Sequence, residues 1–264
     1  SLVHVTRTLV SLVKRAGLVE ALSAKGPYTL LAPTEKAFAK LPKATVRELV
    51  KPANRGRLQQ ILKYHVVPGR VDLDGLVRRG ALSTLAGDAI TVSADAHGRA
   101  VVNGNSAFGA IIMFETYWVF HEIDTVLMPP EKNIVEVAAG AGTFGTLIAA
   151  AKAAGLAEAL TGKGPFTVLA PTDEAFAKLG QKKIKDLLRP ENKPVLAAIL
   201  KFHVVPARVL AADAVRAGTA ESLLKRGNLD FGIANGRLRV ENANVIKNDI
   251  LASNGVIHVI DRVL

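Results

Sequence analysis

The sequence predicts two α+β domains in tandem. Four segments occur twice in the same order, which indicates a duplicated domain. In each copy, segments with apolar residues at helical spacing come first and short alternating segments come last. This order is typical of an α+β domain rather than of a doubly wound sheet. The chain has 264 residues, enough for two domains of about 130 residues each.

The repeat has a long and constant period. Residues 26–41, GPYTLLAPTEKAFAKL, match residues 164–179, GPFTVLAPTDEAFAKL, at 12 of 16 positions, 138 residues apart. The pairs AGLVEAL and AGLAEAL, and ILKYHVVPGRV and ILKFHVVPARV, have the same spacing, and HEIDTVL and HVIDRVL are 137 residues apart. Solenoid units repeat every 20–50 residues or so. We therefore expect domain 1 at residues 1–128, a stiff Pro-Pro linker at 129–132 and domain 2 at 133–264.

The first elements of each copy are predicted as helix, strand and helix. The opening helices are expected within residues 6–22 and 134–160, before a Gly-Pro pair in each copy. The β segments TLLAP and TVLAP follow. Thr34 and Thr172 then have the residue type and acidic followers of helix N-caps, with Phe38 and Phe176 one turn later as core anchors.

The later elements are predicted as one more helix and then strands. Helices at residues 57–64 and 193–202 lead into the β segment HVVP. The last third of each copy alternates and is rich in turn residues, which indicates strand hairpins.

The blocks TLLAPTEKAFAKL, ILKYHVVPGRV and HEIDTVL, in this order and present in both copies, closely resemble the fasciclin domain. The resemblance covers residues 1–128 and 133–264. It implies a compact α+β unit in which helices pack on a wedge-shaped β-sandwich. It also implies a secreted, periplasmic or cell-surface protein, a non-enzymatic binding module for adhesion or association with extracellular matrix.

The resemblance also implies a set of binding residues. Tyr64-His65 matches the Tyr-His adhesion motif of the family, whereas Phe202-His203 lacks the hydroxyl. Asp249-Ile250 matches the Asp-Ile motif that some animal fasciclin domains present to integrins. The partner-binding residues so predicted are Tyr64, His65, Val66, Val67, Phe202, His203, Asp249 and Ile250.

The residues by themselves favour structural roles at these positions. His65 and His203 are expected to be buried histidines whose ring nitrogens bond to the backbone or to a carboxylate. Asp124 and Asp261, three residues after His121 and His258, are expected to close their domains through backbone or Arg contacts. The pair Asn254-Gly255 predicts a hairpin turn beside Asp249-Ile250.

Domain 1 departs from this pattern near its end. With the copies aligned on the histidine of HEIDTVL and HVIDRVL, Ile112-Met113 lies opposite Asp249-Ile250, and the polar turn NDILASNG becomes IIMFETYW. We therefore expect the first hairpin not to form in the same way. Three explanations are open: an interface with the other domain or a second chain, a groove for an apolar molecule such as a lipid or carotenoid, or a rebuilt core. The residues of this predicted apolar site or interface are Phe108, Met113, Phe114, Tyr117, Trp118 and Phe120.

The sequence predicts no catalytic residue, metal site or cofactor. Cysteine is absent, which excludes thiolate ligands and disulfides. Neither a His-Glu-x-x-His nor a Gly-x-Ser-x-Gly pattern occurs, so a hydrolase built on His65 or His203 would lack a recognisable nucleophile. Residues 140–145 spell Gly-x-Gly-x-x-Gly but follow no predicted strand, which argues against nucleotide binding.

The net charge of +11 is shared between the copies, with +6 up to residue 130 and +5 after it. A basic surface is either a solvated face or a binding site for a polyanion. The expected partners are an extracellular protein or acidic polysaccharide, an apolar small molecule, or a second copy of the chain. Aromatic residues are not interleaved with the basic ones, so nucleic acid is not expected. The sequence also predicts no transmembrane segment and no signal peptide. The basic residues noted are Arg55, Arg57, Lys63, Arg70, Arg78, Arg79, Lys182, Lys183, Lys185, Arg189 and Lys193.

Overall fold

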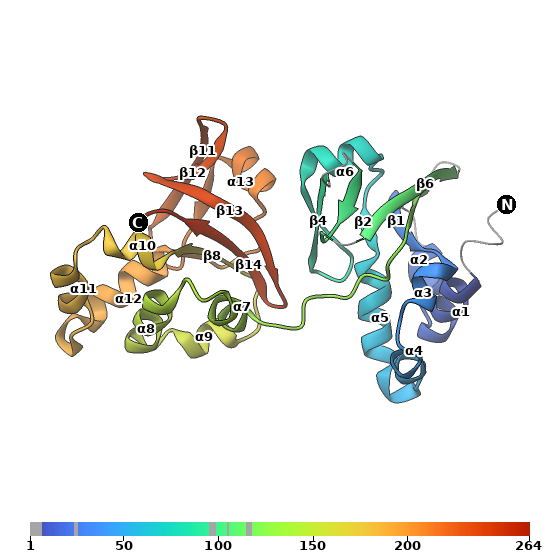
Figure 1. The fold of residues 1–264 in the computed structure, drawn as a ribbon, viewed down its shortest axis with the longest axis horizontal. Coiled ribbons are helices and arrows are strands. Elements are labelled where there is room, and N and C mark those ends of the chain that lie inside the picture. Colours follow the sequence, from blue (N-terminus) through green and yellow to red (C-terminus); the bar gives the residue numbers. More distant parts are fainter. Residues whose placement is uncertain (1–6, 24–25, 95–98, 105, 115–117) are drawn as a thin grey trace. The chain divides into compact units, whose positions relative to one another are not determined.

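A computed structural model describes residues 7–23, 26–94, 99–104, 106–114 and 118–264; at residues 22–23 and 106–114 it describes the backbone alone. The chain divides into two compact units, residues 1–129 and 130–264, here called domain 1 and domain 2 (Figure 1). Each has a sheet with helices packed on it, so the predicted pair of α+β domains is confirmed.

The described elements of domain 1 follow the predicted order. Its helices are α1 (Arg7–Ala16), α2 (Val19–Ser23), α3 (Glu35–Ala39), α4 (Lys43–Leu49), the 3-10 helix η2 (Pro52–Asn54), α5 (Arg55–Tyr64) and α6 (Leu73–Arg79). Its strands are β1 (Tyr28–Pro33), β2 (Val66–Pro68), β3 (Ala81–Ser83), β4 (Ala89–Ala94), β5 (Ala100–Val102), β6 (Ser106–Phe114) and β7 (Trp118–Ile123).

Domain 2 repeats this series and begins with one helix more than the described part of domain 1. Its helices are α7 (Ile134–Ala141), α8 (Gly145–Ala154), α9 (Ala157–Thr161), α10 (Asp173–Ala177), α11 (Gln181–Leu187), the 3-10 helix η3 (Pro190–Asn192), α12 (Lys193–Phe202) and α13 (Ala211–Ala217). Its strands are β8 (Phe166–Pro171), β9 (Val204–Val205), β10 (Thr219–Glu221), β11 (Asn228–Ala234), β12 (Arg237–Val240), β13 (Ala243–Ala252) and β14 (Gly255–Ile260).

The long helices expected at the start of each copy are divided. Gly17 ends α1 with a φ of +68°, and Gly142 and Gly155 end α7 and α8 in the left-handed conformation. Glycine adopts this conformation without the steric cost that a Cβ imposes, so it stops a helix and lets the chain turn back. The helices can therefore stack around one side of the sheet instead of extending away from it.

Each domain has one mixed sheet with the same strand order. In domain 1 the order is β2-β1-β7-β6-β5-β4-β3, and in domain 2 it is β10-β11-β12-β13-β14-β8-β9, the same order read from the other edge. The first strand pairs in parallel with the last, β1 with β7 and β8 with β14, and the other pairs are antiparallel. The first and last strands of each domain therefore lie side by side within the sheet, next to the edge strand β2 or β9.

The sheet bends until its two edges meet, which produces the predicted wedge. Register shifts in β6, between Phe108 and Ile111, and in β13, between Val245 and Ile250, mark bulges that bend a strand. In domain 1 the Leu85 N–H beyond edge strand β3 donates to the Val66 carbonyl oxygen of the opposite edge, at 2.8 Å. In domain 2, Leu223 N–H donates in the same way to Val204, at 2.7 Å.

Two apolar layers follow from the alternation of side chains along β1 and β8. Leu31 and Leu169 point between the two halves of the sheet, into the cores that α6 and α13 complete. Their neighbours Ala32 and Ala170 belong to the core on the other face, under the helices. Among the described residues, no helix is long and apolar enough to cross a membrane.

Candidate functional site

The first signature block caps two helices at once. The Thr34 hydroxyl accepts the Ala37 N–H at the start of α3, and the Thr172 hydroxyl accepts the Ala175 N–H at the start of α10. Both predicted N-caps are therefore confirmed. The acidic residue that follows reaches an earlier helix: Glu35 accepts the backbone N–H and the hydroxyl of Thr8 in α1.

Asp173 does the same for α8, where it accepts the backbone N–H groups of Gly145 and Thr146. In both domains these hydrogen bonds hold the pKa of the carboxyl below its ordinary value. The predicted anchors Phe38 and Phe176 are buried in the helical layer. The block is thus used inside each domain, to join helices to each other and to the core.

His65 and His203 join the three signature blocks at one point. The Nδ1 of His65 lies 2.8 Å from the Ile61 carbonyl oxygen, and its Nε2 accepts the Leu127 N–H at 2.9 Å. An accepting Nε2 requires that Nδ1 carries the proton and donates it to Ile61. The carbonyl of His65 also accepts the N–H of Leu31 in β1. His203 repeats this arrangement with Ile199, Leu264 and Leu169.

Burial keeps both of these histidines neutral. Each is 1% exposed, and burial lowers the pKa of His65 and of His203 to about 4. Protonation of Nε2 would break the hydrogen bond to the end of the domain. The geometry therefore confirms the structural role that the sequence predicts for both histidines.

Tyr64 and its neighbours face the interior of domain 1. Its hydroxyl donates to the Ala89 carbonyl oxygen at 2.7 Å and accepts from Asn103 Nδ2 at 3.1 Å. Tyr64, Val66 and Val67 have exposed fractions of at most 2%. A partner docked on the folded surface would not touch these side chains. In domain 2, Phe202 is half-buried at the corresponding position and packs at the edge of the core.

The histidine of the last signature block holds the loop after HVVP. The Nε2 of His121 lies 2.8 Å from the Val71 carbonyl oxygen, and His258 makes the same contact with Val209. Of the two aspartates that follow, Asp261 has the backbone contact expected of it, whereas Asp124 pairs with a lysine rather than with an arginine. Asp124 pairs with Lys40 at 3.2 Å, and Asp261 accepts the backbone and side-chain N–H groups of Asn244.

Asp249 lies in the bulge of β13 and is bonded on several sides. Its φ is +54°, a conformation that aspartate tolerates better than most residues. Its N–H donates to His258 Nδ1, and its carboxylate accepts the N–H of Ala211 at the start of α13 and the side chain of Asn248. Burial raises the pKa of Asp249 and lowers that of His258. Asp249 and Ile250 are each half-buried.

The first hairpin forms, but not in the same way as the second, as its sequence predicts. Phe114 pairs with Trp118 across the turn of domain 1, and Ala252 pairs with Gly255 across the turn of domain 2. The first loop is therefore one residue longer. This extra residue shifts the alignment, so that Ile111-Ile112, rather than Ile112-Met113, lies opposite Asp249-Ile250.

The second hairpin turn is also displaced by one residue. It consists of Ser253 and Asn254, whereas Gly255 belongs to β14. Asn254 ties this turn to two helices: its Oδ1 accepts the N–H of Ile134 in α7, and its Nδ2 donates to the carbonyl oxygens of Leu160 and Gly162 at the end of α9. The role of Gly255 is steric, because a Cβ there would meet the Phe166 carbonyl oxygen and the side chain of Ile134.

The described part of the aromatic stretch covers one face of the domain 1 sheet. The rings of Trp118 and Phe120 stack with centroids 5.8 Å apart, and Tyr28 of β1 lies 5.1 Å from Trp118. Trp118 stands at the position of Gly255, whose missing Cβ points at Ile134 of α7. The aromatic rings thus lie on the sheet face that α7 covers in domain 2. Tyr117 and the side chains of Phe108, Met113 and Phe114 lie outside what the structure describes.

Sequence reasoning missed that the basic residues gather at equivalent places. Residues 43–57, from α4 to the start of α5, contain five basic residues and one acidic residue. Residues 181–195, from α11 to the start of α12, contain five basic and two acidic residues. These two segments, here called the basic surfaces, lie 138 residues apart and carry +7 of the net +11. The constant spacing of the repeat was the signal that could have revealed them.

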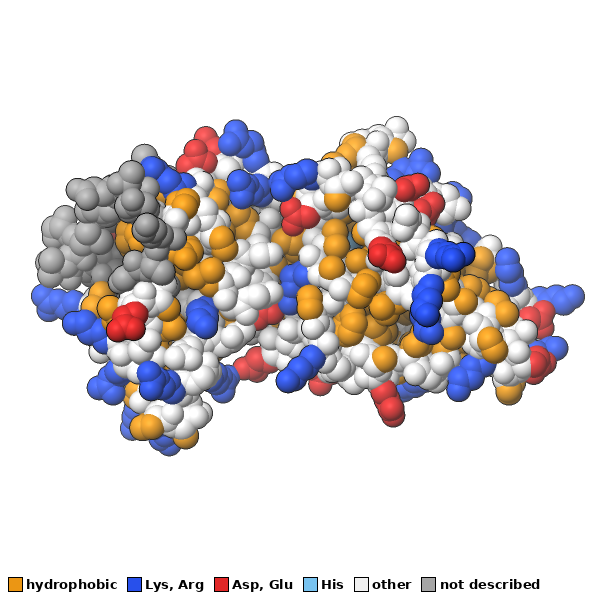
Figure 2. Space-filling model, turned by 180° about the vertical axis from the view of Figure 1, so that it is seen from behind, with side chains coloured by type: hydrophobic (Ala, Val, Ile, Leu, Met, Phe, Trp, Pro, Cys, Tyr) orange, Lys and Arg blue, Asp and Glu red, His pale blue; other side chains and the backbone are white. Residues whose placement is uncertain are grey.

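The basic side chains are exposed and several have no partner. Lys43 of domain 1 and Lys182, Lys183 and Lys185 of domain 2 are exposed, and none of the four forms an ion pair or hydrogen bond through its amine within the described residues. Figure 2 shows Lys and Arg side chains distributed over both domains. No group of three or more metal-ligating side chains occurs among the described residues.

Comparison with known proteins identifies the family. The model of the fasciclin domain matches residues 4–129 and 142–264. The chain belongs to the fasciclin family. Half of the chain resembles "Protein sll1483" of Synechocystis, 53% identical over 132 residues that are 50% of this chain and 72% of that protein. Transforming growth factor-beta-induced protein ig-h3 of Sus scrofa is 33% identical over 241 residues, which span 90% of this chain and 35% of that longer protein.

A solved structure also aligns with both domains. It is a FAS1 domain pair from the insect cell adhesion molecule fasciclin I, 17% identical, with a TM-score of 0.49 over 100% of this chain and 98% of that one.

Proposed function

We propose that this fasciclin-family chain is a non-enzymatic adhesion or matrix-association module of the cell exterior or envelope, and that its two basic surfaces bind an acidic polysaccharide. The observation that carries the proposal is the position of the charge. Both domains place an excess of basic side chains on the same helical segment, and together these segments hold most of the net charge.

The signature motifs support this assignment because their polar side chains are already bonded within the domains. The ring nitrogens of His65 and His203 are bonded inside their domains, and the hydroxyl of Tyr64 is bonded in domain 1. Such groups are occupied in the folded state and do not supply a catalytic base or a contact surface. The lysines of the basic surfaces, in contrast, are exposed.

Two equivalent surfaces on one chain suit a polymeric ligand. A polysaccharide repeats its carboxylates, so it can engage both domains at once and gain avidity without a new kind of contact. Lys182 and Lys185 lie three residues apart, and Lys43 and Arg47 four apart, so each pair shares a helix face.

A direct test measures binding of the whole chain to polygalacturonate, a carboxylated polysaccharide, at low and high salt. We expect binding to weaken steeply as salt rises, because exposed charges are screened within about 10 Å at 0.1 M salt. Reversal of three lysines, Lys182→Glu, Lys183→Glu and Lys185→Glu, should weaken binding about tenfold or more.

The matched control reverses three exposed lysines of domain 2 outside the basic surface, Lys132→Glu, Lys163→Glu and Lys225→Glu. It changes the net charge by the same amount and should leave most of the affinity. Equal losses in both triple variants would contradict a defined surface, and salt-insensitive binding would point to packing against a partner.

The alternative function is a carrier of an apolar small molecule, a lipid or carotenoid, through residues 108–120. The stacked rings of Trp118 and Phe120, with Tyr28 beside them, are its described support.

A further inference from the structure

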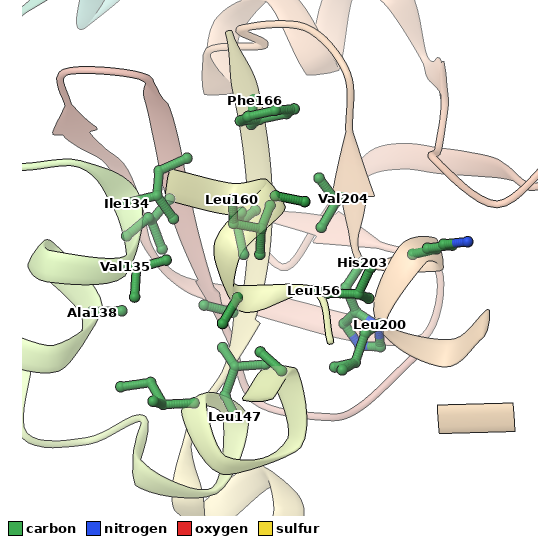
Figure 3. A pocket seen from close by; sticks show the side chains of 18 of the residues that line it. Ile134, Val135, Ala138, Leu147, Leu156, Leu160, Phe166, Leu200, His203 and Val204 are labelled. Atoms are coloured by element: carbon green, nitrogen blue, oxygen red, sulfur yellow. The ribbon is translucent and has the colours of Figure 1, made fainter. Parts of the chain in front are cut away.

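An apolar cavity of about 80 Å³ lies within domain 2. Its walls come from helices α7, α8, α9 and α12 and from strands β8, β9 and β14. Figure 3 shows Ile134 and Val135 of α7, Leu147 of α8 and Leu160 of α9 around it, with Phe166 at one end. It lies on the helical side of the sheet, and no residue of α11 lines it.

The wall offers no hydrogen bond to a polar ligand. Of the 19 lining residues, all but Lys201 and His203 are apolar. Both ring nitrogens of His203 are already bonded, to the Ile199 carbonyl and the Leu264 N–H. Cavities lined in this way exclude water and accept hydrocarbon. The occupant must therefore present carbon to this space.

The size of the cavity selects a narrow occupant. A dry cavity of about 150 Å³ accommodates benzene, and this one has about half that volume. An aromatic or cyclic end group is too wide, whereas the end of an unbranched alkyl chain is not. Leu223, 38% exposed, and the half-buried Leu156 line the cavity and border solvent, so the rest of a chain can leave along them.

A cation stands among the lining residues. Lys201, in the last turn of α12, lines the cavity and is exposed, and it forms no hydrogen bond or ion pair through its amine within the described residues. An amine beside an apolar cavity complements an amphiphile with a negative head group. We propose that domain 2 binds an unbranched alkyl carboxylate, with the end of its chain in this cavity and its carboxylate at Lys201.

Domain 1 has larger side chains at several of the corresponding positions. Val13 and Val19 stand where domain 2 has Ala151 and Ala157, and Leu30 stands in place of Val168. A cavity in domain 1 that has part of the corresponding wall, at Leu9, Leu62 and His65, is bounded by α3 and α4 and has only about 20 Å³. The proposal therefore assigns one alkyl site to the chain, in domain 2.

The test uses the whole chain with two probes, decanoate and the uncharged 1-decanol, each below its aggregation or solubility limit. Isothermal titration should give one decanoate site per chain. The double variant Ala151→Val with Ala157→Val narrows the cavity with the residues that domain 1 itself carries, and it should weaken decanoate binding at least tenfold. The control Ala153→Val, on the exposed face of α8, should bind as the parent chain does.

A second pair of variants tests the carboxylate. Lys201→Ala should weaken decanoate binding several-fold and leave decanol unchanged, whereas Lys63→Ala, at the corresponding position of domain 1, should change neither. Urea unfolding of each variant shows whether the domain remains folded. The reversed lysines of α11 should bind decanoate normally, which separates this site from the proposed polysaccharide surface.

Three results would overturn the proposal. The first is absence of decanoate binding by the parent chain. The second is undiminished binding by the folded double valine variant, which would place the ligand elsewhere, for example at residues 108–120. The third is an equal loss of decanoate and decanol in Lys201→Ala, which would remove the carboxylate from the assignment.

Discussion

The side chains of Tyr64 and His65 both lie in the interior of domain 1, although the family resemblance predicts that they bind a partner at the surface. Each polar atom of the pair has a partner within domain 1, and both residues are fully buried. Phe202 replaces the tyrosine in domain 2, so the hydroxyl serves domain 1 alone, where Ala89 and Asn103 bond to it. The histidine is common to both domains because its ring links the last residues of the domain to the helix that precedes β2 or β9.

Removal of the hydroxyl tests this interpretation. Tyr64→Phe leaves the Ala89 carbonyl without its buried donor, so we expect the unfolding free energy of domain 1 to fall by about 1–2 kcal/mol. Urea denaturation measures this, with Phe202→Tyr as the variant in which no gain is expected. Binding to polygalacturonate should not change. Weaker binding at unchanged stability would return Tyr64 to the contact surface.

At the scale of elements, the turn between β13 and β14 organises the helices that open domain 2. Asn254 accepts from the start of α7 and donates to two carbonyl groups at the end of α9. These are helix-end groups that would otherwise lack an intrahelical partner. One side chain thus fixes both helices against the sheet, beside the proposed alkyl site.

We expect Asn254→Ala to destabilise domain 2 by about 2–4 kcal/mol, because two partly buried hydrogen bonds and one exposed one are lost. Amide hydrogen exchange should quicken in α7 and α9 before it does in α12. Asn254→Asp keeps the acceptor for Ile134 and should recover part of the loss. The control Ser253→Ala alters the neighbouring turn residue and should behave as the parent chain. Uniform exchange across all helices of the alanine variant would contradict this assignment.

At the scale of the whole molecule, both domains depend on neutral buried histidines. Burial lowers the pKa of His65 and His203 from 6.5 to about 4. The unfolded chain therefore takes up protons between pH 6.5 and pH 4 that the folded chain does not. The stability that these two histidines contribute is constant above this window and falls as the pH decreases through it.

Between pH 8 and pH 5 we expect the unfolding free energy of each domain to fall by about 2 kcal/mol, because the buried histidine, His65 or His203, stays neutral in the folded state. The carboxyls of Glu35 and Asp173, whose pKa values are lowered, add to the loss at still lower pH. Urea denaturation across this range measures the effect, and the NMR titration of the two imidazoles checks its origin. Titration of either ring near pH 6.5 in the folded protein would contradict this explanation.

The sequence by itself determined the duplication, the α+β class and the local elements around each signature block. Thr34, Thr172 and the two phenylalanines could be assigned because capping and helical spacing act over three or four residues. The burial and hydrogen bonding of His65 and His203 could also be predicted, because a histidine that is flanked by apolar residues is most often a structural residue.

Tertiary structure alone decided what depends on distant segments meeting. The hairpin register followed from a single extra residue in the first loop, and the role of Gly255 followed from its approach to Phe166 and Ile134. The apolar cavity of domain 2 is likewise assembled from segments that contact one another only in the fold. Local pattern specifies each element and each basic segment, but a cavity is created by packing, which no short stretch of sequence contains.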